Sequence, residues 1–171
     1  MYTLRLMRSL LVDFEPDHGA AASQVDPGTA LGDWYVVGVI VGARDLAVCL
    51  SARSHLTLVF PRPSSADLPQ HLAATLVAVL RDLGVSQPAI AAELEEMTDG
   101  AIAAASDRRT LGVLTARVAL VRRHVAEIAP GAVDARRLHR VLADRRVRRG
   151  GESCGARAAR LLENRGDDPS R

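Results

Sequence analysis

The sequence predicts an α+β fold: a small mixed or antiparallel sheet of about four strands packed on two to three helices, with a C-terminal arginine-rich helical extension. Two observations carry this prediction. Before residue 61 the apolar residues are β-branched or alternate along the chain, which is typical of strands. From residue 67 onward they recur at intervals of three and four, which is typical of helices that bury one side. The length of 171 residues suits one ordinary domain with some chain left over.

The strand region begins at the N-terminus. Residues 2–6 alternate well enough for a short strand, and residues 34–41 form the continuous β-branched run of a strand covered on both faces. Residues 46–50 and 56–60 alternate in a way that predicts an antiparallel meander with one aliphatic face. Residues 15–32 are rich in Gly, Pro and Asp, and they predict a long loop between the first two strands.

Three helices are expected next. Asp67 is the expected N-cap of a helix that ends at Gly84, and Ser86 is the expected N-cap of a second, short helix. Residues 100–105 are ambiguous, and we favour a short strand that rejoins the sheet. Asp107 then caps the strongest helix, whose apolar stripe consists of Leu111, Leu114, Val118, Val121, Val125 and Ile128. Four acidic residues before it are interpreted as a solvated helix end: Glu93, Glu95, Glu96 and Asp99.

A soft domain boundary is expected near residue 130. Residues 1–130 would form the α+β core domain, and residues 131–171 an arginine-rich helical extension with a frayed tail that lies outside the aliphatic core. All 22 basic residues are arginine. Residues 1–129 hold 11 Arg against 14 acidic residues, a net charge of −3, whereas residues 130–171 hold 11 Arg against 6 acidic residues, a net charge of +5.

Composition excludes several classes of protein. Hydrophobic residues make up 48% of the chain, which is enough to bury a core, and aromatic residues only 3%, which argues against a base-stacking surface. The longest uncharged apolar run, residues 34–43, is about half of what a membrane helix requires. Cys49 and Cys154 are interpreted as free thiols in a reducing compartment. Together with the GC-rich codon bias that the use of Arg in place of Lys indicates, these features predict a cytoplasmic bacterial protein.

Four short motifs occur in a suggestive order along the chain. They are the opening Leu4-Arg5-Leu6, the strand entry Leu31-Gly32-Asp33-Trp34-Tyr35, the segment Leu58-Val59-Phe60-Pro61 before a helix, and the helix start Arg108-Arg109-Thr110-Leu111-Gly112. In this combination they resemble an uncharacterised bacterial domain family, one of the catalogued domains of unknown function. The resemblance covers residues 1–127 and leaves the arginine-rich extension outside. It implies an α+β fold and no particular activity.

The last of these motifs departs from the family in its second half. The family motif reads Asn-Arg-Ser-x-Leu-Gly-Ser-Met-Asn-Asp, so that Asp107 stands for the first Asn and Leu111-Gly112 match. The next four residues, Val113-Leu114-Thr115-Ala116, replace its polar remainder. The resemblance therefore implies that any polar site built from those positions is weakened here.

Two turns are candidate ligand or partner surfaces. At Asp107-Arg108-Arg109, a helix N-terminus and two guanidiniums would together capture an anion, although a simple N-cap with solvated arginines explains the same residues. At Asp33-Trp34-Tyr35, the only Trp of the chain would line a pocket beneath the 15–32 loop, although a Trp that fills the core explains it equally.

The arginine-rich segment 133–149 is a third candidate surface. Its guanidiniums would rest on a phosphate backbone and bind it in a salt-sensitive manner without sequence preference. Because Asp134 and Asp144 are interspersed and no known nucleic-acid motif accompanies them, a solvated or partner-docking helix is the simpler interpretation. The residues concerned are Arg136, Arg137, Arg140, Arg145, Arg146, Arg148 and Arg149.

The sequence predicts no catalytic residue, metal site or cofactor, because its five His and two Cys lack the spacing of known sites. The leading hypothesis is a non-catalytic binding or protein-interaction module with an unknown protein partner. The alternative is a nucleic-acid-associated protein that uses the arginine-rich helix. A third is an enzyme that acts on a phosphorylated or carboxylated small molecule near Arg108. A homodimer through the stripe 111–128 is not favoured, since the stripe is shorter than three heptads.

Overall fold

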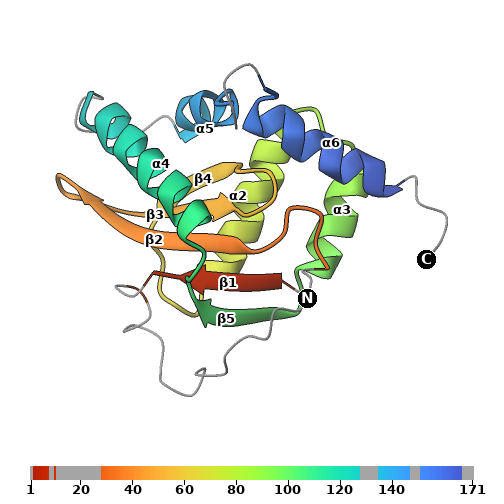
Figure 1. The fold of residues 1–171 in the computed structure, drawn as a ribbon, viewed down its shortest axis with the longest axis horizontal. Coiled ribbons are helices and arrows are strands. Elements are labelled where there is room, and N and C mark those ends of the chain that lie inside the picture. Colours follow the sequence, from red (N-terminus) through yellow and green to blue (C-terminus); the bar gives the residue numbers. More distant parts are fainter. Residues whose placement is uncertain (1, 8–9, 11–27, 128–134, 147–150, 167–171) are drawn as a thin grey trace.

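The computed structural model describes residues 2–7, 10, 28–127, 135–146 and 151–166, and it confirms the α+β class (Figure 1). Most of the 15–32 loop, together with Arg148 and Arg149, lies outside the described residues. The strands are β1 (Tyr2–Leu6), β2 (Trp34–Val41), β3 (Arg44–Ser51), β4 (Thr57–Pro61) and β5 (Gly100–Ala104). The helices are α2 (Leu68–Asp82), α3 (Gln87–Glu96), α4 (Arg108–Glu127), α5 (Ala135–Ala143) and α6 (Cys154–Gly166).

The sheet has five strands in the order β4-β3-β2-β1-β5, one more than expected, because the ambiguous segment before Asp107 pairs along its full length with β1. β1 is parallel to both of its neighbours, whereas β2, β3 and β4 form the expected antiparallel meander. The β2–β3 turn contains Gly42 at φ +61, a backbone conformation that glycine adopts without strain. The sheet is therefore mixed, with β4 and β5 at its edges.

Both faces of the meander are buried, where the sequence led us to expect one aliphatic face. In β3, Ala47 and Cys49 belong to one hydrophobic cluster, and Leu46, Val48 and Leu50 belong to a second cluster on the opposite face. The small side chains on the first face are apolar too, so that both sides can lie against helices. The buried apolar residues of α2 pack into the first cluster and those of α4 into the second.

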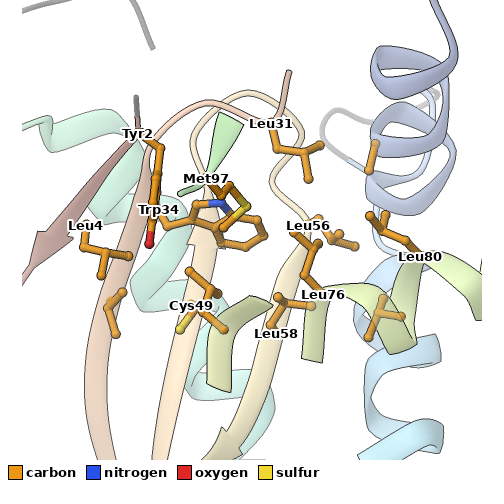
Figure 2. Packing of buried hydrophobic residues seen from close by; sticks show 14 of the residues in the cluster. Tyr2, Leu4, Leu31, Trp34, Cys49, Leu56, Leu58, Leu76, Leu80 and Met97 are labelled. Carbon is orange, nitrogen blue, oxygen red and sulfur yellow. The ribbon is translucent and has the colours of Figure 1, made fainter. Parts of the chain in front are cut away.

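Trp34 lies inside the first cluster and has no exposed surface. Figure 2 shows its indole among the labelled side chains of Tyr2, Met97 and Leu56. The indole N–H is buried without a hydrogen-bond partner among the described residues. Trp34 therefore fills the core, which is the simpler of the two interpretations of its position, and it offers no surface to a ligand.

The arginine-rich extension is part of this core, where the sequence led us to expect it outside. Leu138 and Leu142 of α5 are buried in the second cluster, and Ala158 and Leu162 of α6 are buried in the first. Figure 1 shows α5 beyond β4, at the end of the sheet opposite β5. The chain is therefore not divided into two packing units near residue 130, because the helices that follow this point complete both clusters.

Glu93 is also buried, so its assignment to a solvated helix end was wrong. Only 1% of its surface is exposed, and its carboxylate accepts hydrogen bonds from the backbone N–H groups of Ala30 (2.7 Å) and Leu31 (3.0 Å). Arg165 of α6 lies 3.7 Å from the same carboxylate. Glu93 therefore joins α3, α6 and the segment before β2 at one point.

Candidate anion-binding site

An open hollow of about 680 Å³ runs along one side of α4, a volume typical of small-molecule sites. Residues from four turns of α4 form one wall, because positions separated by three or four residues share a helix face. The turn before β4 and the segment that follows α5 supply the rest. The lining residues are His55, Arg109, Gly112, Val113, Ala116, Arg117, Ala119, Leu120, Arg123, Arg145 and Arg146.

The charge of this hollow is one-sided. Five of its lining residues are arginines, and none is acidic. Arg109 and Arg123 come from the first and last parts of α4, whereas Arg145 and Arg146 follow α5, so that tertiary packing joins segments distant in sequence. Like charges that converge in a hollow between low-dielectric walls concentrate a positive potential there. The hollow therefore favours an anion.

Small residues keep the wall of the hollow open. Gly112, Ala116 and Ala119 lie between the arginines on the lining face of α4, and a Cβ added to Gly112 would meet no atom within 4 Å. Larger side chains at these positions would occupy the space between the guanidiniums. The spacing thus leaves room for a ligand.

Arg117 is the most deeply placed of the lining arginines, with 8% of its surface exposed. One of its terminal nitrogens donates a hydrogen bond to the Sγ atom of Cys154, over 3.0 Å. Its Nε–H has no hydrogen-bond partner among the described residues. Because a buried guanidinium is costly unless it is paired, this arginine is an exception that calls for an explanation.

His55 lines the hollow from the turn between β3 and β4. It is the only described residue other than glycine with a positive φ, at 59°. Burial lowers its pKa, and the guanidiniums of Arg157, Arg117 and Arg109 lower it further. His55 is therefore neutral at pH 7, and it lies within the electric field of three arginines.

Cys154 is not set up as a nucleophile. Burial raises the pKa of its thiol, although Arg117 and Arg157 act in the opposite direction. A neutral, buried thiol accepts a hydrogen bond from Arg117 but is a weak nucleophile. Burial likewise raises the pKa of the Cys49 thiol in β3. The described residues also hold no group of three His, Cys, Asp or Glu side chains that would bind a metal ion.

The predicted surface Asp33-Trp34-Tyr35 is built into the fold. Arg5 donates a hydrogen bond of 2.6 Å to the carboxylate of Asp33, which also accepts the backbone N–H of Thr3 over 3.1 Å. Tyr35 is buried on the α4 side of the sheet. Its pKa is raised, chiefly by burial, and Asp107 is among the charges that act on it. This surface is thus held by internal contacts, and Tyr35 links it to Asp107 at the start of α4.

The residues of the predicted surface Asp107-Arg108-Arg109 have separate roles. Asp107 caps α4 as expected, because its carboxylate accepts the backbone N–H groups of Arg109 and Thr110, each over 3.1 Å. The hydroxyl of Thr110 also donates to it and is the main cause of its lowered pKa. Arg108 is exposed and does not line the hollow, whereas Arg109 does.

The C-terminal arginines also divide. Arg136 donates two hydrogen bonds to Asp82 of α2, the first of them 2.7 Å long. Arg137 and Arg140 are exposed on α5 outside the hollow, and Arg145 and Arg146 line it. The hollow thus brings Arg109 of the predicted surface Asp107-Arg108-Arg109 together with Arg145 and Arg146 of the arginine-rich segment.

Sequence reasoning missed His55, Arg117, Arg123 and Arg157. A signal for Arg117 exists, because it lies between Leu114 and Val121 at the spacing of the apolar stripe, where a charged residue is unexpected. No comparable signal exists for His55, which reaches the hollow only through the β3–β4 turn.

The family model described as Domain of unknown function (DUF6933) matches residues 3–155. The match continues through α5 to the start of α6, beyond the limit of residues 1–127 that the motifs led us to expect. No curated protein matches the chain. In the part of the chain that the structure describes, no helix is long and apolar enough to cross a membrane.

Proposed function

The chain belongs to the DUF6933 family, whose description assigns no activity, and we propose from its geometry that the protein is a non-catalytic module that binds an anionic ligand in the arginine-lined hollow. One observation carries the proposal: Arg109, Arg123, Arg145 and Arg146 converge there without an acidic lining residue. A ligand of opposite charge would relieve their mutual repulsion, and guanidiniums hold phosphate and carboxylate groups by paired hydrogen bonds.

The non-catalytic part of the proposal rests on the chemistry of the lining residues. Arginine is always protonated at physiological pH and is a poor general base. His55 is the one lining residue whose side chain can act as a base at neutral pH, and no carboxylate or nucleophile of the lining accompanies it. We propose that the protein works in a bacterial cytoplasm, where its anion is a free ligand or part of a protein partner.

Nucleic-acid binding is the second candidate function. Arg145 and Arg146 line the hollow, and Arg140 is exposed on the preceding helix, so that a phosphate backbone would find three basic side chains in a short stretch of chain. The ion pair between Arg136 and Asp82 weighs against it, because it occupies one of the arginines that this function needs. The low aromatic content also leaves little to stack on bases.

Neighbouring arginines on α4 supply a matched test. Arg109→Ala and Arg123→Ala each remove a charge from the hollow, whereas Arg108→Ala and Arg122→Ala remove one from exposed positions that do not line it. We expect the first pair to weaken binding of a nucleoside triphosphate about tenfold or more, since a charged hydrogen bond contributes about 1.5–3 kcal/mol. We expect the control pair to change it less than about twofold, because these two arginines do not line the hollow and act on the ligand only across screening solvent.

Isothermal titration calorimetry on the full chain measures these affinities, and a short DNA duplex is titrated in parallel at two salt concentrations. Binding of the triphosphate by the wild type, with the loss confined to the first pair, supports the proposal. Equal losses in both pairs would mean that the net charge matters and the hollow does not. Tighter and steeply salt-dependent binding of the duplex would instead favour the second function.

A further inference from the structure

Three basic side chains meet beside the hollow, at the junction of the β3–β4 turn, α4 and α6. Arg117 and Arg157 both lower the pKa of His55, and both also act on the thiol of Cys154. Arg117 donates a hydrogen bond of 3.0 Å to the Sγ atom of Cys154, and Arg157 follows Cys154 by three residues on α6 and so shares its face of the helix. Arg117 and His55 both line the hollow, so the four side chains form one cluster at its edge.

Two donors of this cluster lack acceptors. The Nε–H groups of Arg117 and Arg157 are both buried without a hydrogen-bond partner among the described residues. Arg117 is more than nine-tenths buried, and the one hydrogen bond that its guanidinium donates within the described residues goes to a neutral thiol, which is a weak acceptor. Buried polar groups are nearly always paired in folded proteins, so that two unpaired Nε–H groups in one cluster mark the place of a missing acceptor.

Two backbone N–H groups at the start of α6 already have acceptors. The N–H of Cys154 donates to the carbonyl of Arg145 over 2.7 Å, and the N–H of Ala156 donates to the hydroxyl of Ser153 over 3.2 Å. These two N–H groups therefore need no further acceptor, whereas the Nε–H groups of Arg117 and Arg157 do.

We propose that Arg117, Arg157 and His55 form a subsite for a dianionic phosphate group, at the inner end of the ligand whose outer part Arg109, Arg123, Arg145 and Arg146 hold. This inference rests on the proposed function and narrows it to one ligand chemistry. A phosphate group carries about −1.5 to −2 charges at pH 7 and three acceptor oxygens, which matches two guanidiniums that approach from different helices. A carboxylate offers half the charge and two coplanar oxygens.

The phosphate group has two possible sources, a small phosphate ester or the terminal phosphate of a nucleic acid, and the chemistry of the subsite is common to both. His55 reports on either source. A dianion between Arg117 and Arg157 offsets the charges that lower the pKa of His55, so that binding raises this pKa toward its ordinary value.

The test is an NMR titration of the His55 imidazole in the full chain, with inorganic phosphate and with a nucleoside monophosphate as probes. We expect a saturable rise of the His55 pKa with both. We expect Arg157→Gln to weaken phosphate binding about tenfold or more. The matched control is Arg160→Gln on the same helix, whose side chain is exposed and pairs with Glu152, and we expect it to change binding less than about twofold.

Because Arg117 is buried, Arg117→Lys is used only if its circular dichroism spectrum matches that of the wild type. If the spectra differ, the His55 titration of the wild type tests the subsite. A 5′-phosphorylated oligonucleotide compared with its unphosphorylated form separates the two sources of the phosphate group. If the triphosphate binds but His55 does not respond and Arg157→Gln has no effect, the subsite is wrong and the anion-binding function stands. If no anion binds the wild type, both fail.

Discussion

Glu93 illustrates at the scale of one residue how burial changes the role of an acidic side chain. Its carboxylate holds the backbone N–H groups of Ala30 and Leu31 at the entry to β2, and Arg165 balances part of its charge. Burial nevertheless raises the pKa of Glu93 above its ordinary value. The residue is thus a connector between α3 and the strand entry, and its stability contribution depends on those two hydrogen bonds.

We expect Glu93→Ala to lower the free energy of unfolding by about 2–4 kcal/mol, because it leaves two buried N–H groups without an acceptor. Urea denaturation measures the change as a shift of the midpoint. Glu95→Ala is the control, since Glu95 is exposed on the same helix, and we expect its effect to stay within about 0.5 kcal/mol. Equal effects of the two substitutions would contradict the structural role of Glu93.

At the scale of an element, α5 protects an edge of the sheet. β4 is an edge strand, and the backbone N–H of its residue Val59 lies 2.9 Å from Nε2 of His139, which accepts a hydrogen bond when the ring is neutral. Exposed edges invite pairing with other chains, and a covering helix prevents it. Burial lowers the pKa of His139, although the carbonyl of Val59, which also lies 2.9 Å from Nε2, and the charge of Asp82 act in the opposite direction.

This arrangement predicts a pH dependence. The pKa of His139 is lower in the folded state than its unfolded value of about 6.5, so the unfolded state binds more protons in this range. Its contribution to stability is therefore complete above pH 6.5 and declines as the pH falls toward the folded-state pKa. Glu93 acts in the opposite direction, because the pKa of a carboxyl that burial raises favours folding as the pH falls.

Comparison with His139→Gln isolates the contribution of the histidine. Glutamine can accept the same N–H but does not titrate, so we expect the variant to lose less unfolding free energy than the wild type between pH 7.5 and pH 5.5. Urea midpoints at both pH values provide the measurement. Parallel pH profiles for the two proteins would show that His139 does not titrate on unfolding in this range.

At the scale of the whole molecule, the core depends on the arginine-rich helices. Leu142 is fully buried in the cluster on the α4 side of the sheet, whereas Trp34 is fully buried in the cluster on the α2 side. Ala143, the neighbour of Leu142, belongs to the cluster of Trp34. The two clusters therefore share α5, and we expect the described residues to unfold as one cooperative unit.

We expect Leu142→Ala to destabilise the whole protein by about 2–5 kcal/mol, because it leaves a cavity in the core. The fluorescence of Trp34, the only Trp of the chain, reports on the far cluster, and far-ultraviolet circular dichroism reports on the helices. The two signals should shift together in urea, as expected for one cooperative transition. Separate transitions, with the Trp34 signal unaffected by the substitution, would instead show that the C-terminal helices unfold independently of the rest.

The sequence by itself determined where most of the helices and strands lie along the chain. The strands at Tyr2–Leu6 and Trp34–Val41, the cap at Asp107 and the stop at Gly84 all follow from local rules of periodicity, capping and backbone conformation. The family resemblance, like these elements, depends on residues that are near one another in the chain. Even the α+β class follows from the change of period alone.

Only the tertiary structure decided which charged residues are buried and which converge. Glu93 and its exposed neighbour Glu95 are chemically alike, and only packing against the strand entry and α6 distinguishes them. The same holds for Arg109, which lines the hollow, and Arg108, which does not. Burial and electric field depend on neighbours contributed by distant segments, and no local pattern of the chain encodes those distances.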